Sequence, residues 1–247
     1  MTDQQAQHPR VAAVTGGSVG IGKVVCEHLL AEGCEVISLA RRRGDNTHPR
    51  LHHIEVDLAD RVATEQAVRE LTQRFEVNTL IHNAGVIRPA LLENVALADL
   101  DMLVNIHLGS AIQLMQGVLP HMRAQGFGRV VMLSSRGALG LATRTSYAAT
   151  KAGIMGMART WALELAPQGI TVNVVAPGPI HTDMYHEVIP QGSDKDRQLA
   201  QSIPVRRVGE SDDVARAVSF FASPANSFVT GQVLYVCGGT SIGSLTL

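Results

Sequence analysis

Short apolar runs alternate with longer amphipathic segments along almost the whole chain. Runs rich in valine, isoleucine and leucine are typical of buried strands, and they fall at 11–15, 35–40, 52–56, 79–82, 129–134, 171–176 and 232–236. Apolar positions with helical spacing fall between them, at 24–31, 63–75, 98–122, 146–165 and 212–222. Such alternation predicts parallel strands joined by right-handed crossovers. We therefore expect an α/β fold: a single Rossmann-type doubly wound parallel sheet of about seven strands, with helices on both faces.

The segments between these elements indicate one domain. No repeat and no linker rich in Pro, Gly or Ser divides the chain, so residues 1–247 are expected to form a single domain with a flexible polar lead-in at 1–10. Gly33 should end the first helix, and Pro120 should bend or end the last turn of the long one. The longest stretch without a clear pattern is 177–196, and a loop of that length is usually functional or mobile.

Composition narrows the class of protein. Of 247 residues, 45% are hydrophobic and 17% are charged, and the net charge is −1. The chain can bury a sizeable core, and it shows no basic excess that would favour a nucleic-acid partner. No run of eighteen apolar residues and no secretory signal is visible, so no membrane partner is expected. The odd cysteine count (Cys26, Cys34 and Cys237) favours reduced thiols and a cytoplasmic location. The ten histidines are scattered, so no metal is expected.

A glycine-rich turn follows the first predicted strand and opens the first helix. Its spacing from Gly16 to Gly22 is G-x-x-x-G-x-G. Gly16 permits a tight turn, Gly20 lets the backbone approach a phosphate, and Gly22 lets the helix pack closely on the sheet. Because backbone N–H groups and the helix dipole meet at this point, the turn predicts a pyrophosphate-binding site.

Two other interpretations of this turn remain open. The segment from Gly17 to Lys23 also fits the start of a nucleoside-triphosphate loop, G-x-x-x-x-G-K, but Val24 stands where a magnesium-binding Ser or Thr is required. That reading is disfavoured because valine cannot bind a metal. The turn could also hold no ligand.

Tyr147 and Lys151 form the strongest candidate for acid/base chemistry. They lie four residues apart on a predicted helix, so both side chains share one face. A nearby ammonium is expected to lower the pKa of the phenol, which suits it to exchange protons with an alcohol or a carbonyl. Ser134 stands thirteen residues before Tyr147. The alternative is a half-buried tyrosine beside a surface lysine.

Taken together, these motifs resemble the short-chain dehydrogenase/reductase family. The resemblance extends from Val11 to Gly239. It rests on T-G-x-x-x-G-I-G at 15–22, Asp57-Leu58, N-A-G at 83–85, Asn105 within V-N-I, the set Ser134, Tyr147 and Lys151, Pro177-Gly178 with Thr182, V-T-G at 229–231, and Gly238-Gly239.

The resemblance implies reversible hydride transfer between a nicotinamide and a carbonyl or alcohol carbon. Tyr147 would exchange the proton, Ser134 would orient the substrate oxygen, and Lys151 would lower the tyrosine pKa and bind the nicotinamide ribose. Asn105 would hold a water that links Lys151 to solvent; alternatively, it is a polar helix residue satisfied by a neighbouring carbonyl. The implied cofactor-binding residues are Gly16, Ser18, Val19, Gly20, Ile21, Gly22, Arg41, Arg42, Asp57, Leu58, Asn83, Ala84, Gly85, Tyr147, Lys151, Pro177, Gly178, Ile180 and Thr182.

Three positions depart from the family pattern or complicate it. His82 stands where a second Asn is usual before N-A-G, and Cys237 stands where Asp is frequent. Ser135 adjoins Ser134, and because adjacent residues at a strand end face opposite ways, only one of the two should serve. The count of thirteen selects Ser134 and keeps Ser135 in reserve.

The end of the second strand bears on the choice of nicotinamide. Ala40 stands where NAD-dependent relatives carry Asp, and Arg41 follows at once. Without a carboxylate for the ribose hydroxyl, and with a guanidinium suited to phosphate, NADP(H) is favoured and NAD(H) remains possible. A solvated basic turn is the alternative.

The sequence says less about substrate and partners. A small carbonyl or alcohol compound is expected, as in 3-oxoacyl-(acyl-carrier-protein) reductases or alcohol, diol and sugar dehydrogenases. A non-catalytic cofactor-sensing protein is the distant alternative. Segment 177–204 is expected to act as a lid, and Arg136 could pair with an acidic substrate. The expected pocket lining is Arg136, Leu139, Leu141, Ile180, His181, Met184, Tyr185 and Val188. Relatives imply a homotetramer or dimer built through 98–122 and 146–165, where the apolar candidates are Leu103, Ile106, Ile112, Met115, Ile154, Met157 and Trp161.

Overall fold

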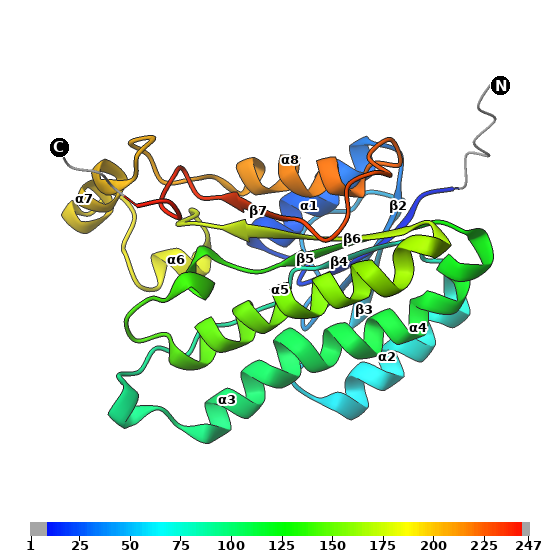
Figure 1. The fold of residues 1–247 in the computed structure, drawn as a ribbon, viewed down its shortest axis with the longest axis horizontal. Coiled ribbons are helices and arrows are strands. Elements are labelled where there is room, and N and C mark those ends of the chain that lie inside the picture. The colour runs from blue at the N-terminus through cyan, green and yellow to red at the C-terminus, as the bar shows by residue number, and fades with distance from the viewer. Residues whose placement is uncertain (1–8, 244–247) are drawn as a thin grey trace.

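A seven-stranded, wholly parallel sheet forms the centre of the molecule (Figure 1). The computed structural model describes residues 9–243, so the predicted lead-in lies almost entirely outside the described residues. The strand order is β3-β2-β1-β4-β5-β6-β7, which confirms the doubly wound α/β prediction. The strands are β1 (Val11–Thr15), β2 (Glu35–Ala40), β3 (Leu51–Glu55), β4 (Thr79–His82), β5 (Gly128–Leu133), β6 (Ile170–Pro177) and β7 (Val233–Val236).

Helices cover both faces of this sheet, which is why its central strands are continuous buried runs. Figure 1 shows α1 and α8 on one face and α2, α4 and α5 on the other. Each face has its own apolar core, the first around Leu29 and Val218 and the second around Leu114 and Ile154. The helices are α1 (Gly20–Ala31), α2 (Arg61–Arg74), α3 (Leu97–Val104), α4 (Ser110–Gln125), α5 (Thr145–Leu165), α6 (Asp183–His186), α7 (Asp194–Ser202) and α8 (Ser211–Ala222).

The predicted long helix is real but interrupted. A π-helical turn, η2 (Asn105–Gly109), joins α3 to α4. Pro120 lies at an exposed position inside α4 and does not end the helix, which continues to Gln125. The helix then ends at Gly126, whose φ of 61° is the left-handed conformation that glycine adopts readily. A π turn within an α-helix frequently marks a functional site, and hydrophobic periodicity does not predict this one.

The segment predicted as a loop at 177–196 contains two short helices. Thr182 and Ser193 cap α6 and α7 through their side-chain oxygens. Tyr185 donates a hydrogen bond to Asp196 Oδ1 at 2.6 Å, and the Gly192 N–H donates to Asp196 Oδ2 at 2.9 Å. The segment that connects β6 to α8 is therefore held together by its own hydrogen bonds.

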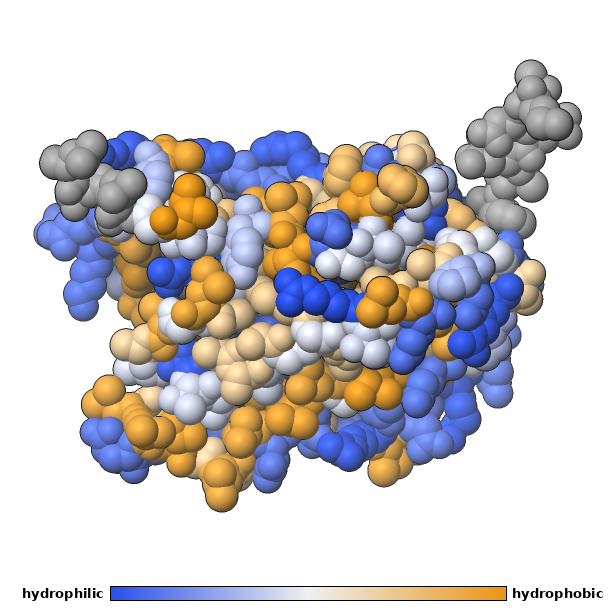
Figure 2. All heavy atoms as spheres, viewed as in Figure 1, coloured by the Kyte–Doolittle hydropathy of each residue, from blue (hydrophilic) through white to orange (hydrophobic). Residues whose placement is uncertain are grey.

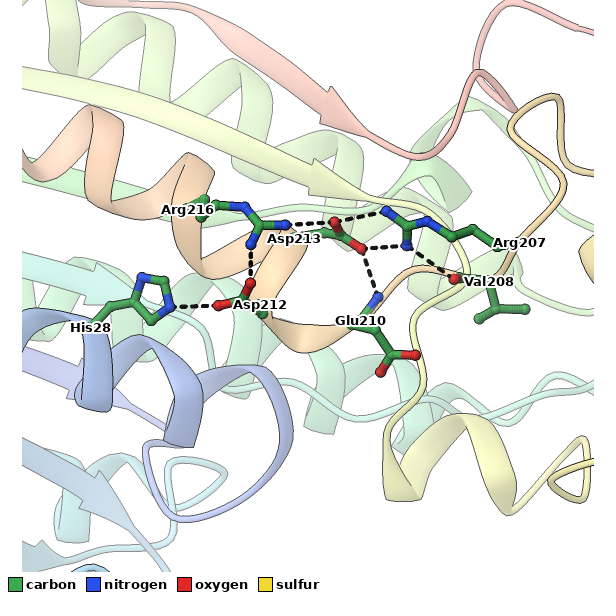
Figure 3. A network of polar contacts seen from close by, with 7 residues as sticks. All are labelled: His28, Arg207, Val208, Glu210, Asp212, Asp213 and Arg216. Atoms are coloured by element: carbon green, nitrogen blue, oxygen red, sulfur yellow. Dashed lines mark hydrogen bonds and ion pairs between the residues drawn. The ribbon is translucent and has the colours of Figure 1, made fainter.

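An ion-pair network joins Arg207, in the connection just before α8, to α8 itself (Figure 3). Both nitrogens of the Arg207 fork donate to Asp213, at 2.6 and 2.9 Å, and Arg216 donates to the same carboxylate at 2.8 Å. These hydrogen bonds hold the pKa of Asp213 well below its usual range. On the other side, His28 of α1 pairs with Asp212 at 2.7 Å. The network ties α1, α8 and residue 207 together at the surface.

The outer helices carry apolar side chains that the core does not use. Figure 2 shows hydrophobic residues gathered around the start of α3, where Leu92 is 76% and Leu97 is 75% exposed. Of the candidates named for an oligomer interface, four are buried, Met157 and Trp161 pack partly against the core, and Ile112 is exposed. The four buried ones are Leu103, Ile106, Met115 and Ile154. Oligomerisation through these helices stays a prediction.

Two further composition-based expectations can be compared with the structure. The helix over Leu97–Gln125 is long and apolar enough to cross a membrane by length and composition, but its apolar side packs into the core beside α2 and α5. Within residues 9–243, no group of three or more His, Cys, Asp or Glu side chains could hold a metal ion. Cys26, Cys34 and Cys237 are free and buried.

Candidate active site

A groove of about 970 Å³ runs along the carboxyl ends of the strands. This volume lies near the upper end of the range of ligand pockets, roughly 300–1,000 Å³. All the residues predicted to bind a cofactor line it except Gly22. Ser134, Tyr147 and Lys151 line it too, whereas Asn105 does not. The parallel topology explains this convergence, because the βα connections of neighbouring strands open at the same edge of a sheet.

The glycine turn has the backbone geometry that close packing and anion binding require. Gly16 and Gly20 have φ values of 66° and 54°, which other residues rarely adopt. A Cβ on Gly22 would lie 2.1 Å from the Gly16 carbonyl oxygen, so only glycine fits beneath the turn. The first turn of α1 has no acidic residue and no side-chain cap, which leaves its N–H groups available to an anionic ligand.

The N-A-G segment supports this turn from the neighbouring strand. The Asn83 amide donates to the carbonyl oxygens of Thr15 and Gly16 at 3.0 and 3.3 Å. The Thr15 hydroxyl in turn accepts from the N–H groups of Asn83 and Ala84, each at 2.9 Å. These bonds hold the ends of β1 and β4 in one arrangement beneath the groove.

The serine beside the tyrosine is Ser135, the residue kept in reserve, and not Ser134. The buried Ser134 hydroxyl donates to the backbone oxygen of Lys151 at 2.7 Å, and so fastens β5 to α5. The Ser135 side chain instead lies close enough to the Tyr147 phenol to favour its ionised form, and it accepts from the Gly137 N–H at 3.0 Å. Adjacent side chains of extended backbone alternate in direction, so a shift of one residue exchanges the two roles.

Tyr147 and Lys151 lie together as the i, i+4 spacing predicts, but their electrostatics differ from the prediction. The ammonium is 5.8 Å from the centroid of the phenol ring and donates to the Leu133 carbonyl oxygen at 2.8 Å. Burial raises the pKa of Tyr147, against smaller lowering effects of the Ser135 hydrogen bond and of Arg144. Burial also lowers the pKa of Lys151 to about 7, because a low-dielectric site disfavours the ammonium. The phenol is therefore protonated at neutral pH, as a proton donor must be.

Two buried histidines lie behind this pair, and no pattern in the sequence predicts that they meet there. The His107 Nε2 accepts from the Val86 N–H at 3.3 Å, so its Nδ1–H donates to the Thr150 hydroxyl at 2.8 Å. The His107 ring also stands edge-on to Tyr147, with centroids 5.8 Å apart. Burial and the nearby Lys151 lower the pKa of His107 to about 2. This neutral imidazole connects the N-A-G turn to the helix that carries the phenol.

His82 occupies the other side of the same buried region. Its Nδ1 lies 3.3 Å from the Thr15 hydroxyl, whose lone pairs already accept two N–H groups, so the hydroxyl donates to Nδ1. The proton of His82 is thus on Nε2, which lies near the backbone of Ile106 and His107 but forms no hydrogen bond of normal geometry with the described residues. Burial, and then Lys151, lower the pKa of His82 to about 3.

Asn105 lies in the π turn, and its side chain bonds to the loop after β3 rather than lining the groove. Its Oδ1 accepts from Arg61 at 2.8 Å, and its Nδ2 donates to the Ala59 carbonyl oxygen at 3.3 Å. This is the satisfied polar residue given above as the alternative. The side chain ties the π turn to the loop after β3, where Asp57 and Leu58 line the groove.

The two ends of the groove differ in composition. Past β2, the exposed Arg41 and Arg42 line it, and Ala40 leaves the strand end without a carboxylate. At the far end, most of the predicted pocket residues line it, but Leu139 and His181 do not. Leu139 turns outward at 55% exposure, and His181 packs against Tyr185 and His186. Those that do line it are Arg136, Leu141, Ile180, Met184, Tyr185 and Val188.

An open parallel sheet with a glycine turn at its switch point defines a dinucleotide-binding protein of the Rossmann type. Sequence comparison defines it further. The family model described as enoyl-(acyl carrier protein) reductase matches residues 16–241. The chain therefore belongs to the short-chain dehydrogenase/reductase family, whose members are oxidoreductases acting on hydroxyl or carbonyl groups with NAD(P).

Relatives span nearly the whole chain. It is 37% identical to the (2S)-[(R)-hydroxy(phenyl)methyl]succinyl-CoA dehydrogenase subunit BbsD of Thauera aromatica, over 94% of this chain and 97% of the relative. It is 36% identical to the 3-oxoacyl-(acyl-carrier-protein) reductase of Thermotoga maritima, over 94% and 98%. Among solved structures, ElxO with NADP bound matches with a TM-score of 0.86 and 27% identity, over 94% of this chain and 98% of that one.

Proposed function

We propose that the protein is an NADP(H)-dependent oxidoreductase that interconverts a 3-oxoacyl thioester and its 3-hydroxy form, with Tyr147 as the acid/base. The observation that carries this proposal is the meeting of two hydroxyls, Tyr147 and Ser135, inside the groove that begins at the glycine turn. The nicotinamide, when bound, supplies the hydride. Everything else required of the protein is positioning and proton transfer.

In the reductive direction the protonated phenol donates to the substrate oxygen. Ser135 lies against the phenol, so its hydroxyl can hydrogen-bond the same oxygen and orient it. The Lys151 side chain donates a hydrogen bond to the Leu133 carbonyl oxygen at the end of β5 and has a pKa of about 7. It can therefore supply a proton to Tyr147 after the phenol has donated its own. The same amine faces the groove, where it can bind a ribose hydroxyl.

The residues of the groove fit a phosphorylated dinucleotide. The glycine turn and the free N–H groups of α1 suit the pyrophosphate. Beside the end of β2, Arg41 and Arg42 supply positive charge where no carboxylate would repel a 2′-phosphate. The NADP of the ElxO structure and the 3-oxoacyl reductase relative support this choice.

The proposed substrate class is supported by two relatives whose names describe reactions beside a thioester. One is a dehydrogenase of a hydroxyacyl-CoA, and the other is a reductase of 3-oxoacyl groups on acyl carrier protein. The apolar lining of the far end of the groove suits an acyl chain, with Met102, Leu141 and Met184 among its residues. The free thiols are compatible with action in the cytoplasm.

The test is the oxidation of NADPH with a panel of 3-oxoacyl thioesters, diketones, cyclic ketones and sugars. We expect turnover with the thioesters, and a fall of about 10³-fold in kcat for Tyr147→Phe, because general acid catalysis contributes roughly 10²–10⁴-fold. NADPH binding, followed by quenching of the single tryptophan, should be unchanged in that variant. Activity near the wild-type level in Tyr147→Phe would remove the phenol from the mechanism.

A further inference from the structure

Five arginines line the groove, and their pairing divides them into two groups. Arg88 has a carboxylate nearby, with its Nε 3.5 Å from Asp99. Among residues 9–243, no carboxylate lies within ion-pair distance of the other four, whereas exposed arginines elsewhere commonly have one, as in the pair Arg69–Glu65. The four are Arg41 and Arg42 beside the end of β2, and Arg136 and Arg144 at the substrate end.

Arg144 stands beside the acid/base residue. It is the residue that precedes α5, three positions before Tyr147, and its charge opposes, as a smaller effect, the rise that burial causes in the Tyr147 pKa. Its side chain is half-buried, and one guanidinium nitrogen donates to the Thr143 oxygens at 2.5 and 3.3 Å. A guanidinium has five N–H donors, so most of them are left for a ligand.

The residue before Arg144 has a costly backbone conformation. Thr143 has a φ of 65°, the left-handed region that favours glycine. The Ala90 N–H donates to the Thr143 carbonyl oxygen at 3.0 Å, and Ala90 forms a parallel bridge with Arg144. Contacts between two separate loops thus fix the residue before Tyr147's helix, and strain of this kind is concentrated at functional sites.

Arg136 approaches the same end from the β5 side. It begins the turn after Ser135, and its Nε donates to the Thr240 carbonyl oxygen at 3.2 Å, which positions the guanidinium along the groove wall. Its two terminal nitrogens have no recorded partner in the described chain. The acidic residues of the groove lining, Asp57 and Asp183, pair with neither arginine. The apolar members at this end are Met102, Leu141, Met184, Val188, Ile189 and Leu199.

We infer that Arg144 and Arg136 form a carboxylate-binding subsite, so that the substrate is an acyl compound bearing a free carboxylate in addition to the carbonyl that is reduced. The inference rests on the proposed function and specifies its substrate. A carboxylate matches the planar fork of a guanidinium, which binds it through two parallel hydrogen bonds. A neutral substrate would offer neither guanidinium a carboxylate to bind. A site that is built to hydrogen-bond one polar group of its substrate rejects analogues that lack this group.

The experiment compares matched substrates. The N-acetylcysteamine thioesters of 3-oxo dicarboxylic acids, in a series of chain lengths, are assayed against the same compounds methylated at the distal carboxylate. We expect the wild-type kcat/KM to be at least about 10-fold higher for one acid than for its ester, because a hydrogen bond to a charged group has roughly this effect or more. Arg144→Gln and Arg136→Gln should each remove most of that acid-to-ester ratio, whatever their effect on the rate that both substrates share, and Arg144→Lys should restore part of the ratio.

Arg88→Gln is the matched control, because it removes one positive charge from the same groove but from an arginine that already has an acidic neighbour. It should leave the ratio nearly unchanged, and an equal loss in this variant would reduce the effect to general attraction and overturn the subsite. NADPH affinity is measured for every variant. If Arg144→Gln weakens NADPH as much as it weakens the acid, the arginine serves a cofactor phosphate and the inference is wrong.

Failure of the subsite and failure of the proposed function have different signatures. Equal reduction of acid and ester by the wild type overturns the subsite and leaves the function intact. If neither thioester is reduced, the function fails, and the subsite is then decided by binding. The saturated dicarboxylic thioester should raise the Tm of the NADPH complex, its methyl ester should not, and Arg144→Gln should abolish the difference. No difference in the wild type would overturn the inference.

Discussion

The two ends of the groove are built from different materials. The end at the glycine turn is made largely of backbone: positive-φ glycines, unpaired N–H groups of α1, and an asparagine amide that holds two strand ends together. The far end is made of side chains from connections after β4, β5 and β6. A turn built on backbone geometry accepts few residue types at its key positions, whereas a surface built from side chains can change one residue at a time. The first end can therefore be predicted from a single sequence, and the second is seen only in the folded structure.

The hydroxyl at the junction of the two ends gives the largest expected effect. Ser135→Ala should lower kcat by about 10²–10³-fold, the usual effect of removing a donor to a reacting oxygen. Ser134→Ala should lower kcat by less than about threefold, because its hydroxyl bonds only to the Lys151 backbone oxygen, but it should reduce stability by about 1 kcal/mol. Steady-state kinetics and chemical denaturation of both variants provide the measurement. A larger kinetic loss in Ser134→Ala would reverse the assignment.

The glycine-turn end is probed by its arginines. Arg41→Ala combined with Arg42→Ala should raise the KM for NADPH by about 10- to 100-fold and that for NADH by less than about twofold, since only the former carries the 2′-phosphate. Arg43→Ala is the control, because Arg43 lies outside the groove. Equal changes for the two cofactors would show that these arginines do not recognise the phosphate.

The buried layer beneath both ends should make stability depend on pH. His82 has a pKa of about 3 in the folded protein and about 6.5 when unfolded, so its contribution is fully present above about pH 6.5 and declines below it, as the unfolded chain takes up the proton. The slope is at most about 1.4 kcal/mol per pH unit for each such group. His82→Asn should reduce the slope of the unfolding free energy between about pH 5 and 6.5 by up to that amount. Above about pH 7.5 the difference between the two proteins should no longer change with pH, and an unaltered slope below pH 6.5 would contradict burial of a neutral imidazole.

What the sequence could and could not predict follows the same division. Strands β1, β2 and β4 begin and end at the predicted residues, because buried parallel strands are unbroken apolar runs bounded by Gly or polar residues. The serine was missed because a count along the chain assumes a fixed loop length, and in this protein Ser135 is twelve residues before Tyr147. The tyrosine pKa was missed because helix spacing places Lys151 nearby but says nothing of how deeply both groups are buried.

The π turn and the paired histidines lay beyond sequence reasoning for a different reason. His107 is defined by contacts with Val86 and Thr150, which are 21 and 43 residues away in the chain. Periodicity reports one helix face, not which distant loop meets it. Arg144 belongs to the same category, because its position depends on the bridge to Ala90.

The connection between β6 and α8 is fastened at both of its ends, and this bears on how molecules enter and leave. The Gly178 N–H donates to the Val236 carbonyl oxygen at 2.9 Å, and Arg207 forms two hydrogen bonds with Asp213 on α8. Because both ends are held, we expect the segment between them to open by a local change around the hydrogen bond from Tyr185 to Asp196. Breaking that bond would then set how readily small molecules pass into and out of the groove.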